Sequence, residues 1–266
     1  MLKNYNISFE PGNMLTIDML RTMYESPKEI QEHIFKDYSN GIISGMDIKE
    51  ENGILIITSG IYKSAGNLFI LDKDWSSEDS SFKEGKNYVV YIESDRGMLK
   101  TYSQMKENVI INRAEIKVSL ESDMDNKEKI ILCEFKGKPK IPKNCEELIY
   151  GIFYVLNFCH SCYKEPVYHQ LVFRIIYNKL CEKDNKHPFD YMLMSEIAKS
   201  GIIPLAIIKQ YITETFGFCN KLESESLFKK FVEAIEKLEL KVYTSDYKEK
   251  PKNKSEKEDS ERIIVF

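Results

Sequence analysis

Residues 41–48 read Gly-Ile-Ile-Ser-Gly-Met-Asp-Ile, and residues 53–60 read Gly-Ile-Leu-Ile-Ile-Thr-Ser-Gly. β-Branched residues dominate both runs, as they do in strands. Glu51, Asn52 and Gly53 connect the two runs and have the composition of a hairpin turn. A third apolar run, residues 67–71, follows another glycine. This stretch therefore predicts a small antiparallel sheet, and the rest of the chain is organised around it.

The residues in front of this sheet predict two short amphipathic helices. Thr16 can accept a hydrogen bond from the first free amide groups of one helix. Pro27 suits the first turn of a second helix, with Ser26 before it as the cap. The apolar residues that share a helical face are Ile17, Leu20, Met23 and Tyr24, followed by Ile30, Ile34, Phe35 and Tyr38. We expect both helices to pack on the sheet or to lead into it.

Three further runs, residues 88–93, 109–120 and 129–135, also predict strands. Within residues 114–120, apolar and polar side chains alternate, which is typical of a sheet with one face in water. Together the runs give six or seven strands, enough for a small sandwich. Residues 1–140 are therefore expected to form an antiparallel β-sandwich-like docking domain with leading helices.

Residues 136–143 interrupt this pattern with two prolines and a glycine among lysines, so we place a domain boundary there. The remaining chain predicts helices over residues 145–158, 166–180, 191–199, 205–216 and 224–238. Residues 141–244 thus form a predicted all-α helical domain, and the fold class is α+β.

Residues 245–266 form a predicted flexible tail, because residues 245–262 are almost entirely polar and cannot bury enough surface to offset the entropy of ordering. The tail nevertheless ends in four consecutive apolar residues, Ile263, Ile264, Val265 and Phe266. This segment is a candidate interaction site. It could add a strand to the sheet edge of a partner, or it could return to a sheet of its own chain.

Composition limits the function classes. The chain has 266 residues, of which 42% are hydrophobic and 30% charged, with a formal net charge of −4. It lacks the overall positive charge that holds proteins on nucleic acid, so nonspecific nucleic-acid binding is not expected. No apolar run approaches the roughly 20 residues of a membrane span, and the start lacks the apolar core of a signal peptide. We expect a cytoplasmic protein whose six cysteines are reduced thiols.

The strongest chemical motif is Cys159-His160-Ser161-Cys162, with His169 shortly after it. Two cysteines at this spacing can bind zinc, so Cys159, Cys162 and His169 are candidate metal ligands. A structural zinc site needs four ligands, and the chain contains no second Cys-x-x-Cys motif. Buried structural thiols fit the motif better, so no cofactor is predicted.

Other catalytic and nucleotide-binding motifs are absent from the sequence: there is no phosphate-binding glycine loop and no Gly-x-Ser-x-Gly elbow. Residues 195–211 have the outline of a helix-turn-helix, with a glycine between two helical runs. The second run offers Lys209 and Gln210, but it is otherwise composed mostly of buried-type residues. Its composition favours a core helix over a DNA-reading helix.

The N-terminal third resembles phage-tail and contractile-injection baseplate proteins, including the TssK-type adaptor of type VI secretion and receptor-binding-protein shoulders. The resemblance rests on Pro-Gly-Asn-Met-Leu-Thr-Ile-Asp-Met-Leu at 11–20, Asp-Tyr-Ser-Asn-Gly-Ile-Ile-Ser-Gly-Met at 37–46, and Ile-Thr-Ser-Gly-Ile at 57–61. It implies a β-sandwich shell entered from a helix and no catalytic residues. It also implies a homo-oligomer, commonly a trimer, that attaches to other baseplate or tail proteins.

Two function hypotheses follow. The first is a non-enzymatic structural or adaptor protein of a baseplate-like assembly, acting by protein–protein docking. The second is a cytoplasmic regulator whose helical domain binds DNA through residues 195–211. The first is preferred, because the resemblance supports it and the composition of the second helical run opposes the DNA-binding hypothesis.

Overall fold

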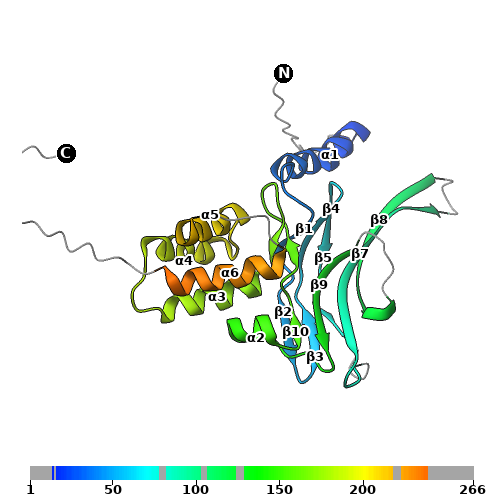
Figure 1. Cartoon of the computed structure of the whole chain (residues 1–266). Coiled ribbons are helices and arrows are strands. Elements are labelled where there is room, and N and C mark those ends of the chain that lie inside the picture. Colours follow the sequence, from blue (N-terminus) through cyan, green and yellow to red (C-terminus); the bar gives the residue numbers. More distant parts are fainter. Residues whose placement is uncertain are drawn as a thin grey trace, which may run out of the picture.

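A computed structural model describes residues 14, 16–77, 82–102, 107–123, 129–217 and 223–238 (Figure 1). Helix α1 (Ile17–Ile34) projects from one end, the sheets form the middle, and most of the other helices lie on one side of them. Within the described residues, no helix is long and apolar enough to cross a membrane. Both helices and antiparallel-rich sheets are present, so the predicted α+β class is confirmed.

The strands form three sheets. The first has the order β12-β11-β1-β4-β5, the second β10-β9-β7-β8, and the third β2-β3-β6. Strand bounds are β1 (Gly41–Gly45), β2 (Ile48–Glu51), β3 (Ile54–Ile57), β4 (Gly60–Ser64), β5 (Asn67–Leu71), β6 (Trp75–Ser76), β7 (Asn87–Tyr102), β8 (Glu107–Leu120), β9 (Lys129–Lys136), β10 (Phe153–Tyr154), β11 (Phe158–His160) and β12 (Val167–Tyr168). The pairings are antiparallel apart from the parallel contact of β1 with β11. Buried side chains of the sheets and the later helices share one core cluster.

The glycines of the first strands are required by close backbone contacts. Gly45 and Gly60 face each other across β1 and β4. A Cβ on Gly45 would lie 2.2 Å from the Ser59 carbonyl oxygen, and one on Gly60 would lie 2.4 Å from the Ser44 carbonyl oxygen. Neither distance is sterically allowed for a side chain. Glycine at both positions therefore lets β1 and β4 come close together at the end of β1, just before the chain continues into β2.

The sequence predicted one helix over residues 145–158, but α2 (Cys145–Tyr150) ends earlier and β10 and β11 follow it. Gly151 ends the helix in an extended conformation, donating its N–H to the Glu147 carbonyl. The apolar residues beyond it pair with β9 and with β1, so long-range pairing overrides the local helical pattern. The division into domains at residue 140 remains a prediction.

Two other helix predictions also change. The helix expected from Pro166 begins at Gln170, because Val167 and Tyr168 pair with β11. At the N-terminus, the two predicted helices are one continuous helix, α1, with Pro27 inside it. Proline removes one backbone donor from a helix interior, and the carbonyl left without a partner can be hydrated because this segment is exposed.

Helices α3 (Gln170–Glu182), α4 (Pro188–Ser200), α5 (Leu205–Phe216) and α6 (Ser224–Lys237) pack around a buried carboxylate. Asp190 is fully buried and accepts hydrogen bonds from the Lys183 ammonium at 2.8 Å, the His187 N–H at 2.7 Å and the Tyr211 hydroxyl. The Lys183 ammonium also donates to the carbonyl of Leu238, just after α6. The Lys183–Asp190 pair therefore connects the end of α3, the start of α4, the middle of α5 and the end of α6.

We predict that Asp190→Ala lowers the free energy of unfolding by about 3–5 kcal/mol, because it leaves the Lys183 ammonium largely buried without its carboxylate. The exposed neighbour Asp184 provides the control: Asp184→Ala is expected to change stability by less than about 0.5 kcal/mol. Urea unfolding of both variants measures the difference. Equal stabilities would contradict the structural role assigned to Asp190.

Candidate docking surface

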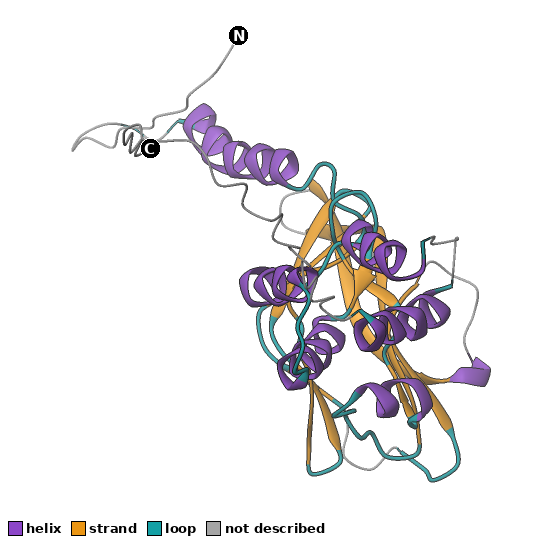
Figure 2. Cartoon of the chain, turned by 60° about the vertical axis from the view of Figure 1, so that its left-hand side comes forward, coloured by secondary structure: helices purple, strands orange, loops and turns teal. Residues whose placement is uncertain are grey.

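Helix α1 has no buried residue, although it carries a continuous apolar face. Figure 2 shows it standing away from the sheets and the other helices. Its large apolar side chains are exposed, with Ile17 and Tyr24 about three-quarters accessible. Contiguous exposed apolar surface of this kind is characteristic of interaction sites in soluble proteins.

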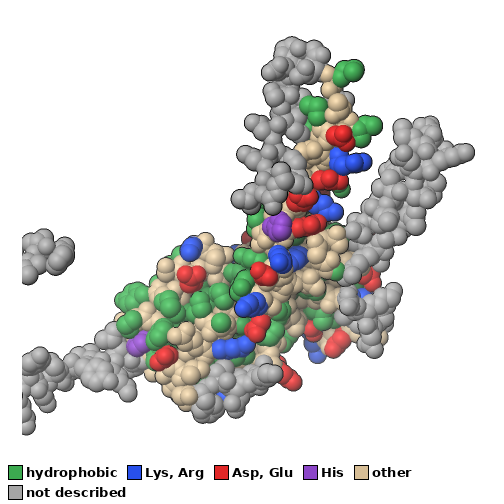
Figure 3. Space-filling model, turned by 90° about the horizontal axis from the view of Figure 1, so that it is seen from above, with side chains coloured by type: hydrophobic (Ala, Val, Ile, Leu, Met, Phe, Trp, Pro, Cys, Tyr) green, Lys and Arg blue, Asp and Glu red, His purple; other side chains and the backbone are tan. Residues whose placement is uncertain are grey.

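The exposed apolar residues form a seam with alternating spacings of three and four. Its members are Leu20, Met23, Pro27, Ile30 and Ile34. This is the spacing with which the a and d positions of paired helices meet. The polar face carries charges of both signs, including the i,i+4 pairs Arg21–Glu25 and Lys28–Glu32. Figure 3, seen from above, shows acidic and basic side chains following one another along this helix.

Lys63 fixes the end of α1 to the body. Its side chain is buried in β4, and its ammonium donates to the carbonyl oxygens of Phe35 and Tyr38, the latter at 2.6 Å. These carbonyls follow the last turn of α1, where the helix dipole favours a positive charge. Lys63 of β4 therefore caps the C-terminal end of α1.

Residues 161–164 also bind the segment after α1, through backbone hydrogen bonds. The Lys164 N–H donates to the Asp37 carbonyl at 2.8 Å, and the Ser39 N–H donates to the Cys162 carbonyl at 3.0 Å. Tyr38 and Tyr163 form an antiparallel bridge between these hydrogen bonds. Together with Lys63, these contacts fix the point at which α1 leaves the body.

A groove of about 1040 Å³ lies between the second half of α1 and the β4–β5 hairpin. Tyr24, Pro27 and Gln31 line it from the helix, while Asn67 and Leu68 line it from the hairpin. The groove exposes one flank of the apolar face. A partner that covers the seam can therefore also contact the hairpin.

The candidate zinc ligands occupy separate structural positions. Cys159 is buried in β11, Cys162 is buried in the loop that holds residue 39, and His169 caps the N-terminus of α3. In the part of the chain that the structure describes, no three His, Cys, Asp or Glu side chains are arranged to share a metal ion. Burial raises the pKa of the Cys159 thiol to about 12 and also raises that of Cys162, so both remain protonated at neutral pH.

Both ring nitrogens of His169 have backbone partners. Nδ1 accepts from the Leu171 N–H at 3.1 Å, which assigns the proton to Nε2, and Nε2 donates to the Met46 carbonyl at 3.0 Å. The side chain thus links α3 to the connection between β1 and β2. Burial is the main reason that its pKa is lowered to about 4.

Residues 195–211 do form two helices around a turn at Gly201, which adopts the left-handed conformation. In α5, however, Ile208, Tyr211 and Ile212 are buried in the core. Lys209 is paired with Glu165 at 2.9 Å. The exposed positions of α5 are Ala206, Gln210, Thr213 and Glu214, which is not a cationic surface for phosphates.

The other candidate interaction segment, residues 263–266, lies outside the described residues. Its role therefore remains a prediction. The exposed seam of α1 was not singled out from the sequence, although the apolar stripe that forms it was recognised as a helical face.

No protein-family model matches the chain, and no curated protein sequence matches it. Among solved structures, it is similar to a crystal structure of TssK, at a TM-score of 0.30 and 8% identity over 87% of this chain and 67% of the other. A chain from the TssK-TssF-TssG baseplate subcomplex of type VI secretion aligns at 0.37 and 10% identity, covering 88% and 100%. A chain of the type VI baseplate complex aligns at 0.35 and 9%, covering 88% and 70%. This is a weak structural match to baseplate proteins.

We predict that Lys63→Met accelerates amide exchange over residues 31–39 and lowers the free energy of unfolding by about 1–3 kcal/mol, because two carbonyls lose a charged donor. The methionine retains most of the apolar stem. Lys73→Met, at an exposed lysine, is the matched control. Unchanged exchange in the Lys63 variant would show that α1 is positioned by other contacts.

A second prediction concerns pH. Ordinary histidine has a pKa near 6.5, whereas the pKa of His169 is lowered to about 4. Between these values the unfolded chain binds a proton that the folded chain does not, so stability falls as the pH falls, by about 3 kcal/mol in total. Burial also lowers the pKa of His160, which adds in the same direction. Urea unfolding as a function of pH should show a shallower dependence in His169→Asn, and an unchanged dependence would contradict this assignment.

Proposed function

We propose that the protein is a non-enzymatic structural component of a phage-tail-like or contractile-injection baseplate assembly and acts by protein–protein docking. The observation that carries the proposal is α1, an amphipathic helix without a buried residue that is held at a fixed point of the body. The resemblance of residues 11–61 to baseplate proteins suggests the kind of assembly.

The partner that best fits the α1 seam is the α1 seam of another copy of this chain. In a symmetric bundle of α1 helices, Leu20, Met23, Ile30 and Ile34 of each copy would bury one another. The positions beside the seam, among them Met19, Tyr24, Ser26 and Gln31, are uncharged. Copies can therefore approach without bringing like charges together, and a trimer is the form we propose.

The fixed position of the C-terminal end of α1 favours such an interface. Association normally loses free energy by ordering flexible segments, and a pre-positioned helix loses less. Lys63 and the contacts of residues 161–164 provide this positioning. The other baseplate or tail proteins would then attach to the sheets of an oligomer whose α1 helices are already occupied.

Three buried groups, Cys145, Cys159 and His169, also fit a structural role better than a catalytic one. Burial raises the pKa of Cys145 to about 11 and that of Cys159 to about 12, so neither is a thiolate at neutral pH. His169 uses both ring nitrogens in backbone hydrogen bonds. None of these three groups is prepared to act as a nucleophile or a general base.

The test is the mass of the protein in solution, measured by size-exclusion chromatography with light scattering. The wild-type protein is expected to be a trimer or larger ring. Ile30→Glu, which places a charge in the seam, should shift it to monomers, because burying an unpaired carboxylate is strongly unfavourable. Thr22→Glu adds the same charge on the other side of α1 and should leave the oligomer intact.

Two results would contradict the proposal. One is a wild-type monomer, and the other is an oligomer that Ile30→Glu does not affect. A monomer or dimer that retards a DNA fragment would support the regulator hypothesis instead. The experiment therefore separates the two function classes.

A further inference from the structure

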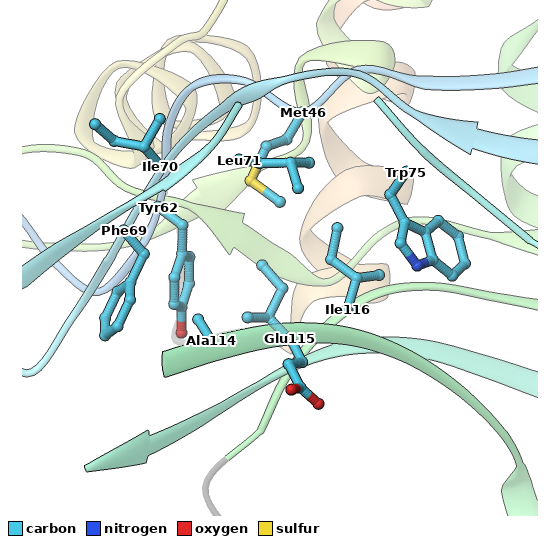
Figure 4. Close-up of a pocket in the computed structure, with 10 residues that line it drawn as sticks. Met46, Tyr62, Phe69, Ile70, Leu71, Trp75, Ala114, Glu115 and Ile116 are labelled. Atoms are coloured by element: carbon cyan, nitrogen blue, oxygen red, sulfur yellow. The ribbon is translucent and has the colours of Figure 1, made fainter. Parts of the chain in front are cut away.

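An apolar slot opens between the edges of the two larger sheets (Figure 4). It has a volume of about 360 Å³. Phe69 and Leu71 of β5 line it from one side, Ala114 and Ile116 of β8 from the other, and Trp75 of β6 at one end. Most of these side chains are only partly buried, so the interior of the sandwich reaches solvent here.

The slot lies beside a free sheet edge. Among the described strands, β5 is the last of its sheet and β8 is the last of the other. The β4–β5 hairpin turns through Ala65 and Gly66, both at positive φ, so Ser64 and Asn67 form the hydrogen-bonded pair that closes it. The alternation of an antiparallel ladder then directs the backbone groups of Leu68 and Ile70 away from β4, toward the free edge.

This edge is apolar on both faces. Phe69 and Leu71 point into the slot, whereas Ile70, which also lines the slot, lies on the other face of β5 and is 74% exposed (Figure 4). Natural proteins cover or charge such edges, because an exposed apolar edge recruits further strands. A strand that covers β5 must itself be apolar on both faces, since one face would fill the slot and the other would lie beside Ile70.

We propose that residues 263–266 of the same chain, Ile-Ile-Val-Phe, add to β5 as an edge strand and close this slot. The segment is apolar at four consecutive positions, which is the pattern of a strand buried on both faces and not of an ordinary amphipathic edge. Alternate side chains of the segment would enter the slot. Its backbone would bond the free groups of Leu68 and Ile70.

The length of the chain permits this contact. The described residues end at Leu238, and Ile263 lies 25 positions further along the sequence. A chain of that length can span about 80–90 Å when extended. A compact protein of this size has a radius of gyration of only about 18 Å. A tethered segment also has an effective concentration of the order of millimolar, which favours its own chain over another copy.

The single tryptophan of the chain reports on the slot directly, because Trp75 lines it. Ending the chain at Arg262 should shift Trp75 emission to longer wavelength and increase its quenching by acrylamide. The same truncation should accelerate exchange of the Leu68 and Ile70 amides by about tenfold or more, since they lose their partners. A synthetic peptide of residues 258–266 should reverse both changes.

A matched pair of variants separates strand pairing from simple apolar contact. Ile264→Pro combined with Val265→Pro keeps the segment apolar but removes two backbone donors, and it should behave like the truncation. Ile264→Val combined with Val265→Ile keeps the strand and should behave like the wild type.

The proposal is overturned if Trp75 emission and the exchange of residues 67–71 are the same with and without residues 263–266. It is also overturned if protection of β5 disappears on dilution while the mass falls, because the segment would then belong to a second copy. Loss of the α1 oligomer alone would leave Trp75 emission and Ile70 exchange unchanged, because the groove beside α1 reaches only residues 63–68 of the hairpin. These two readouts therefore make the test independent of the function proposed above.

Discussion

The arrangement of the whole chain depends on how closely the backbone of β1 approaches its neighbours. A Cβ on Gly41 would lie 2.6 Å from the Cys159 carbonyl oxygen, and one on Gly45 would overlap the Ser59 carbonyl. Gly41 therefore allows β11, which comes from the second half of the sequence, to pack against β1. Gly45 allows β4 to do the same. One five-residue strand therefore joins the N-terminal hairpins to the segment that leads into α3.

The same region determines where α1 leaves the body. Residues 35–39 run between α1 and β1, and they meet Lys63 from β4 and residues 161–164 from the loop after β11. Lys63 belongs to β4 and residues 161–164 directly follow β11, so both partners belong to or follow the strands that pack against the glycines of β1. The direction of the helix is thus a consequence of the sheet, although the helix itself contributes nothing to the core.

Local signals were enough to predict strands at β1, β3 and β5, because turn residues with defined chemistry separate them and each run is dominated by apolar, mostly branched side chains. The predicted pairing of the first two runs as a single hairpin was wrong, because β3 forms its hairpin with β2 and β1 pairs with β4 in a different sheet. They failed for β10 and β11, whose partners lie far away in sequence and whose residues also fit a helical period. The role of Lys63 could not be predicted for a related reason. A lysine inside a strand gives no local sign that its ammonium will meet the carbonyls at the end of a distant helix.

The energetics of α1 connect its structure with association. The Thr16 cap contributes about 1 kcal/mol, and its two i,i+4 ion pairs contribute about 0.3–0.5 kcal/mol each. Pro27 inside the helix costs about 3 kcal/mol, which exceeds their sum. Helices in proteins are normally stabilised by packing an apolar face, and α1 packs none of its residues into the core. The Lys63 anchor stabilises only the last turn, so packing the seam from Leu20 to Ile34 against a partner would stabilise the rest of the helix. Association through this seam would therefore complete the helix as well as the assembly.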